Sequence, residues 1–98
     1  MIVVRDVFHL KFGKAKDVKA LMQESKKFMS EYQVKNSRVL FDLVGHSYTM
    51  VLEMTHKNLA DFESSMSNAL NAKEWGEWYQ KFIPLMESSY REVFTILE

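Results

Sequence analysis

Residues 38–55, which read RVLFDLVGHSYTMVLEMT, decide the fold. Two runs rich in Val, Leu, Phe and Met, residues 38–44 and 48–55, flank the turn residues Gly45-His46-Ser47. Short apolar runs separated by a glycine-containing turn are typical of two antiparallel strands. The segment therefore predicts a β-hairpin in the middle of the chain.

On each side of this hairpin the sequence predicts a helix. Apolar side chains recur at helical spacing over residues 15–32, with lysines and glutamates between them, and Asn36-Ser37 ends the pattern. The second helix begins after Asn58, which is typical of an N-cap because Asp61 follows three residues later. Asn71-Ala72 is a weak break within it. The apolar positions are Ala15, Val18, Leu21, Met22, Phe28, Met29 and Tyr32, then Leu59, Phe62, Met66 and Ala69.

Strands are predicted at both ends of the chain. Residues 2–12 are rich in Val, Ile and Phe and end at Gly13, whereas Pro84 stops the second helix before a last strand over residues 91–97. The resulting order, βαββαβ, predicts an α+β ferredoxin-like fold whose antiparallel sheet has the strand order four, one, three, two. No linker or change of composition divides residues 1–98, so we expect a single domain.

The predicted sheet is apolar on both faces. In the first strand Val3 and Val7 lie on one face, and Val4, Phe8 and Leu10 lie on the other. Two helices on one face leave the second face uncovered, and exposing each large apolar side chain forgoes about 1.5–3 kcal/mol. We therefore expect a homodimer in which a second copy covers this face.

The second helix ends in Glu74-Trp75-Gly76-Glu77-Trp78-Tyr79, and the last strand contains Arg91-Glu92-Val93-Phe94-Thr95-Ile96. Together with the element order and the two-sided sheet, these segments resemble the dimeric α+β barrel superfamily, nearest its NIPSNAP-like and antibiotic-biosynthesis-monooxygenase-like branches. The resemblance implies a homodimer with a pocket between sheet and helices for a small organic ligand. Because the superfamily includes cofactor-independent monooxygenases, isomerases, haem-degrading enzymes and sensor domains, it implies no single reaction.

The composition argues against several classes of partner. Thirteen basic and thirteen acidic residues give a net charge of zero, so no overall field attracts nucleic acid. No stretch is long and apolar enough for a membrane span, and the N-terminus lacks the features of a signal peptide. Without cysteine there are no disulfides or thiolates, so a cytoplasmic protein is expected.

Charged residues inside predicted strands are candidate site residues. Arg5, Asp42, Glu53 and Arg91 each place a charge in an otherwise apolar sheet, which is costly unless the charge is paired. Because the first and third strands are neighbours, Glu53 is expected to reach Arg5 or His9. A pair with His9 is the arrangement of a general base, and a pair with Arg5 is a structural ion pair. Arg5 and Asp42 are predicted to line a ligand pocket.

The remaining histidines, His46 and His56, are interpreted as solvent-exposed loop residues. No pair of histidines has the spacing of metal ligands, so no metal site is predicted. The aromatic group Trp75, Trp78, Tyr79 and Phe82 spans both faces of its helix, and this pattern favours either packing or the wall of a pocket for a flat ligand, with Trp75, Trp78 and Tyr79 as the pocket residues.

Three functions stay open at this level. The first is a small-molecule-binding homodimer that catalyses a cofactor-independent oxygenation or isomerisation, in which His9 or Glu53 moves a proton. The second is a non-catalytic structural or regulatory dimer. The third is a haem-binding barrel with His9 or His56 as axial ligand. No cofactor is predicted for the first function, and these residues do not decide whether the chain is an enzyme.

Overall fold

The structure is a computed structural model that describes residues 1–98 apart from the side chain of Leu70. Its strands are β1 (Ile2–Leu10), β2 (Ser37–Phe41), β3 (Thr49–His56) and β4 (Met86–Thr95). Its helices are α1 (Ala15–Ser25), α2 (Glu31–Asn36), α3 (Leu59–Leu70) and α4 (Lys73–Phe82), with short 3-10 segments η1 (Lys26–Phe28) and η2 (Ile83–Leu85). In the part of the chain that is described, no helix is both long and apolar enough to cross a membrane.

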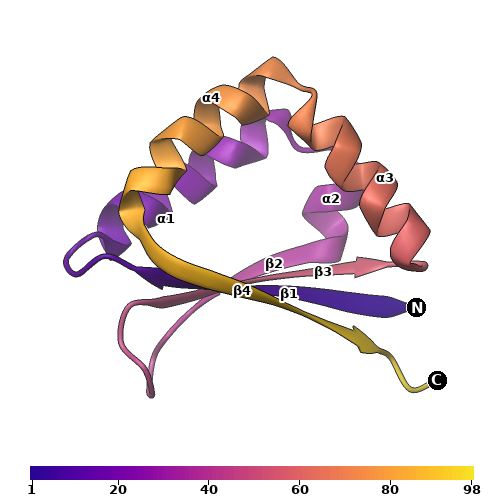
Figure 1. Cartoon of the computed structure of the whole chain (residues 1–98), viewed down its shortest axis with the longest axis horizontal. Helices are drawn as coiled ribbons and strands as arrows, with labels where there is room; N and C mark the ends of the chain where they lie inside the picture. The colour runs from indigo at the N-terminus through magenta and orange to yellow at the C-terminus, as the bar shows by residue number, and fades with distance from the viewer.

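The strands form one antiparallel sheet in the order β2-β3-β1-β4, which confirms the predicted ferredoxin-like topology. All helices lie on one face of this sheet (Figure 1). They form an arch, with α1 and α4 over one end of the sheet and α2 and α3 over the other. The opposite face of the sheet carries no helix, so we refer to it as the open face.

The register divides the side chains of β1 between the two faces. Val4 and Leu10 are buried beneath the helices, so Asp6 and Phe8 share their face by strand alternation. Val7 belongs to the open face, where it lies between Val51 of β3 and Tyr90 of β4. The prediction that both faces carry apolar side chains is confirmed.

The helix boundaries follow local capping. The predicted N-cap is confirmed, because the Asp61 backbone N–H donates to the side-chain oxygen of Asn58 at 2.8 Å. The predicted break at Asn71-Ala72 separates α3 from α4 and lies near the top of the arch. The two helices can therefore cover the sheet from different directions.

The prediction of one continuous helix over residues 15–32 is wrong. The chain leaves the helical conformation at Met29, and α2 starts at a capping box in which Ser30 and Gln33 each bond the other's backbone N–H. A reciprocal cap of this kind satisfies backbone donors that a helix start leaves free, so it begins a new helix.

Several predicted strand ends also move. The connection between β2 and β3 spans residues 42–48, because the Asp42 carboxylate accepts from the Thr49 backbone N–H at 2.9 Å and Tyr48 adopts φ +60°. The last strand begins at Met86 instead of residue 91, directly after η2. The first strand stops at Leu10, two residues before Phe12.

The closely packed core lies at the α1–α4 end of the molecule. Trp78 stacks on Phe82 with ring centroids 4.8 Å apart, and its indole N–H donates to the Leu21 backbone carbonyl at 2.7 Å. This bond joins α4 to α1 over 57 residues of sequence. The core residues are Leu10, Val18, Leu21, Met50, Trp78 and Phe82.

Candidate functional site: a cavity between the sheet and the helices

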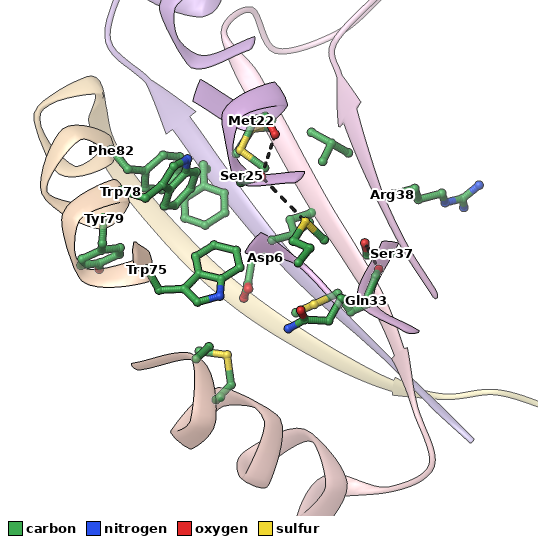
Figure 2. A pocket seen from close by; sticks show the side chains of 18 of the residues that line it. Asp6, Met22, Ser25, Gln33, Ser37, Arg38, Trp75, Trp78, Tyr79 and Phe82 are labelled. Carbon is green, nitrogen blue, oxygen red and sulfur yellow. Dashed lines mark hydrogen bonds between the residues drawn. The ribbon is translucent and has the colours of Figure 1, made fainter. Parts of the chain in front are cut away.

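A cavity of about 910 Å³ lies between the sheet and the helical arch. This volume is within the range of roughly 300–1,000 Å³ that ligand pockets occupy. Side chains from all four strands and from α1 to α4 contribute to its surface. Figure 2 shows Trp75, Trp78, Tyr79 and Phe82 extending from α4 at one side, with Gln33 and Ser37 at the other.

The α4 side of the cavity is aromatic. Trp75 makes edge-to-face contacts with Phe28 and Trp78, at centroid distances of 4.8 and 5.5 Å. Trp78 combines two roles, because it belongs to the core and also lines the cavity. Tyr79 is half-exposed at the cavity wall. Trp75, Trp78 and Tyr79 all line the cavity, and Trp78 also belongs to the packed core.

Methionine supplies much of the remaining surface. Five of the seven methionines of the chain line the cavity, and they come from α1, β3, α3 and the segment between η1 and α2. A methionine side chain is unbranched and polarisable, so it adapts its shape to a bound molecule. The five are Met22, Met29, Met50, Met54 and Met66.

One ion pair lies on the sheet side of the cavity. The Nε of Arg91 lies 2.6 Å from Oδ1 of Asp6, to which the register places it directly opposite. The Asp6 side chain is 11% exposed and that of Arg91 is 44% exposed. The Arg91 guanidinium also lies over the ring of Phe62, 5.0 Å from its centroid. Because each charge is compensated locally, the pair adds hydrogen-bonding groups without a net charge.

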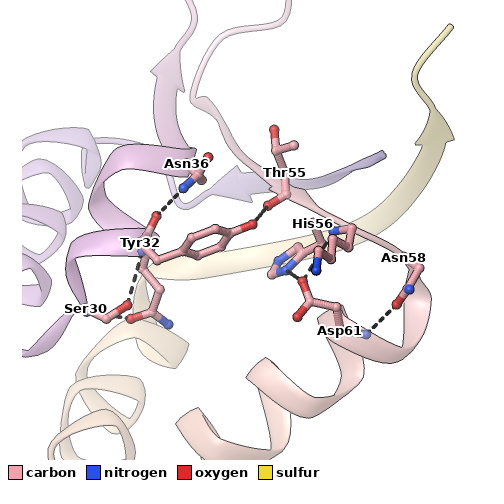
Figure 3. A network of polar contacts seen from close by, with 9 residues as sticks. Ser30, Tyr32, Asn36, Thr55, His56, Asn58 and Asp61 are labelled. Carbon is pink, nitrogen blue, oxygen red and sulfur yellow. Dashed lines mark hydrogen bonds and ion pairs between the residues drawn. The ribbon is translucent and has the colours of Figure 1, made fainter. Parts of the chain in front are cut away.

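A second polar pair lies where β3 meets α3. His56 is the last residue of β3 and is only 3% exposed, so the prediction that it is a solvent-exposed loop residue is wrong. Its Nδ1 lies 3.3 Å from the Asp61 carboxylate, which also accepts from the Lys57 backbone N–H (Figure 3). His56 lines the cavity, and its Nε2 is buried with no hydrogen-bond partner in the described part of the chain.

The predicted residues Arg5 and Glu53 lie on the open face instead. There the register aligns Arg38, Glu53, Arg5 and Glu92 across the four strands, and we call these residues the charged row. Glu53 accepts a hydrogen bond from Arg38 Nε at 2.8 Å. Arg5 Nε lies 3.1 Å from Glu53 but at an angle that makes no hydrogen bond.

His9 also belongs to the open face and is not paired with Glu53. The register places it opposite Thr49, and its ring lies 4.8 Å from that of His46. Asp42 lies in the β2–β3 connection, where it accepts from Thr49. The structure therefore separates the predicted residues: the aromatic group lines the cavity, whereas His9, Glu53 and Arg5 lie across the sheet from it. The two candidate haem ligands, His9 and His56, lie on opposite faces.

No protein-family model matches the sequence, and no curated protein matches it. Solved structures do match. A NIPSNAP family protein of Agrobacterium tumefaciens superposes with a TM-score of 0.89 over 99% of this chain and 86% of its own, at 15% identity. The chain has the fold of the NIPSNAP proteins.

Further structures extend this likeness. An uncharacterized NIPSNAP-like domain protein of Burkholderia xenovorans gives a TM-score of 0.88 at 14% identity, covering 98% of this chain and 84% of its own. A candidate antibiotic biosynthesis monooxygenase of Nitrosomonas europaea gives 0.69 at 14% identity, covering all of both chains. At such identities the NIPSNAP likeness establishes the fold alone. Among the described residues, no three His, Asp or Glu side chains gather to hold a metal ion.

We expect Arg91→Met to lower the free energy of unfolding by about 1–3 kcal/mol, because it leaves the buried Asp6 carboxylate without its partner. Arg38→Met is the matched control: its side chain is 69% exposed, and Glu53 keeps Arg5 nearby. Loss of such an exposed pair costs about 0–1 kcal/mol. Urea unfolding followed by circular dichroism measures both variants, and equal losses would contradict this account of the ion pair.

Proposed function

We propose that the chain binds a small, flat and largely apolar organic molecule in the cavity between sheet and helices, and that it does so as a homodimer. The observation that carries the proposal is the cavity itself. Its volume is sufficient for a multi-ring ligand, and its surface combines aromatic and methionine side chains with a few polar groups.

The cavity surface indicates the class of ligand. Trp75 and Tyr79 offer ring faces and edges on which a flat molecule can stack. Asp6 and Arg91 neutralise one another, so this pair does not require a charged ligand. The methionines of α1, β3 and α3 can adjust to ligands of different outline. These features together favour an uncharged ring system with one or two polar substituents.

A substitution on α3 tests the location of this site. Ala69 lines the cavity, so Ala69→Phe places a ring where the ligand is expected. We expect the affinity for N-phenyl-1-naphthylamine, a neutral dye that fluoresces in apolar sites, to fall at least tenfold. Ala60→Phe is the control, because Ala60 is exposed on the same helix outside the cavity. Equal affinities for the two variants would mean that the dye binds elsewhere.

The open face supports the homodimer. Leu40, Val51, Val7 and Tyr90 form an apolar row across all four strands, next to the charged row. Phe94 lies on the same face and is 46% exposed. Alternating charges complement a copy of themselves turned about a two-fold axis, and the apolar row gives such an interface its hydrophobic contact. A second copy would therefore pair the charges of the charged row and cover the side chains of the apolar row.

Charge placed on this face tests the dimer. We expect the native chain to sediment as a dimer at micromolar concentration and Phe94→Lys to sediment as a folded monomer, because the lysine would be buried between two apolar surfaces. Leu59→Lys is the control: Leu59 is also exposed, but it lies at the start of α3 in the helix layer. A monomeric native chain, or a dimeric Phe94→Lys variant, would contradict the proposed assembly.

Cofactor-independent oxygenation or isomerisation of the bound molecule is the chemistry we propose to assay, since a candidate monooxygenase shares the fold. A catalytic role for His9 and Glu53 stays a prediction. It requires the ligand to reach the open face, because both residues lie across the sheet from the cavity.

A further inference from the structure

Helix α3 buries less of its side-chain surface than the two helices of the core. Among the side chains of α3 that are described, Phe62 alone is buried, at 6% exposure. By comparison, α1 buries Val18 and Leu21, and α4 buries Trp78 and Phe82. The local stability of a segment falls when it buries few apolar contacts. We therefore expect α3 to be less stable than α1 and α4.

Polar side-chain contacts hold α3 only where it begins. The Asp61 carboxylate accepts from the Lys57 backbone N–H and lies 3.3 Å from Nδ1 of His56, at the end of β3. In the described part of the chain, no side-chain hydrogen bond or ion pair joins residues 62–69 to the sheet or to another helix. The polar contacts thus fix the start of α3 and leave residues 62–69, the body of the helix, unattached.

Phe62 is the anchor of this body on the sheet. The Arg91 guanidinium of β4 lies over its ring, 5.0 Å from the centroid, and the imidazole of His56 in β3 meets the same ring edge-to-face at 5.3 Å. A cation over an aromatic face is attracted to it, and Arg91 is itself held by Asp6. One side chain therefore attaches α3 to two strands, and its release would free the helix.

Non-helical residues lie at both ends of α3 and can serve as joints. Asn58, at its start, has φ −161° and ψ 179°, and Ala72, between α3 and α4, has φ −83° and ψ 131°. Hinges in proteins are usually a few residues of this kind at the ends of elements. The helix can therefore turn as one body while its internal hydrogen bonds stay intact.

The face of α3 towards the sheet borders the cavity instead of a packed layer. Ser65, Met66 and Ala69 line the cavity, and all three are half-buried. Because the cavity separates them from the side chains of the sheet, they lack the close contacts that the core gives to α1 and α4. A molecule in the cavity would supply α3 with the apolar contact that the chain itself does not.

We propose that α3 is a lid, which opens locally in the free protein by releasing Phe62 and which a molecule bound in the cavity holds closed. The second part rests on the proposed function, whereas the first concerns the free chain alone. The bond between Trp78 and Leu21 and the core around it do not involve α3, so they persist in the open state. Opening is thus distinct from unfolding.

Native-state hydrogen exchange tests this opening on the unaltered chain. We expect the backbone amides of residues 63–69 to exchange at least about tenfold faster than those of α1 and α4, at rates that low concentrations of urea do not change. The rates of α1 and α4 should rise with urea, because global unfolding exposes much more surface. Rates that rise with urea equally in all three helices would overturn the proposal.

Two variants show which contacts the open state has lost. Phe62→Leu weakens the anchor, so exchange in α3 should become roughly tenfold faster. Val18→Ala is the control, because it removes two buried carbons from a core that the open state keeps. It should make exchange in α1 roughly tenfold faster and leave α3 unchanged. If Val18→Ala also accelerates exchange in α3, this helix opens only when the whole chain unfolds and the lid is refuted.

The dye N-phenyl-1-naphthylamine tests whether a bound molecule closes the lid. At a free concentration ten times its Kd, a dye that binds only the closed state slows exchange in α3 about elevenfold. If the dye slows exchange in α1 but not in α3, it binds without the lid and the second part of the proposal is wrong. A dye that does not bind at all contradicts the proposed function and this second part, while the urea result still decides whether α3 opens.

Discussion

The bond between the Trp78 indole N–H and the Leu21 carbonyl joins two residues of the packed core from different helices. It ties α4 to α1 above one end of the sheet, and the stacked ring of Phe82 fills the space beneath. The other two helices, α3 and α2, extend over the far end of the sheet as the other side of an arch. The cavity is the space that this arrangement leaves between the two layers.

The two faces of the sheet carry different chemistry in consequence. Beneath the arch, the lining of the cavity is mainly apolar and includes the Asp6–Arg91 pair and the buried His56. On the open face, the charged row alternates in sign beside a row of apolar side chains. We interpret the first face as the ligand site and the second as the contact with another copy, so the same sheet would serve both roles.

The order of the elements could be predicted because apolar spacing, Asn58 and Pro84 mark it locally. The location of the site residues could not. Whether Asp6 or Arg5 faces the helices depends on which side of the sheet the helices cover. Alternation along the strand assigns the two residues to opposite faces, but it does not identify the face that the helices cover. His56 was misplaced because its burial comes from α3 and Tyr32, which are distant contacts that the residues around it do not reveal. The Ser30–Gln33 capping box, by contrast, was visible in the sequence.

The central claim, that the cavity between the layers is a ligand site, can be tested through the methionine methyl groups. Met22, Met29, Met50, Met54 and Met66 line the cavity, whereas Met1 and Met86 do not, so the chain contains its own controls. Ring currents of a bound aromatic molecule shift nearby methyl resonances. Titration of methyl-labelled protein with 2-naphthol should shift the five cavity methyls and leave the other two unchanged. Shifts at Met1 and Met86, or none at the five, would contradict the account.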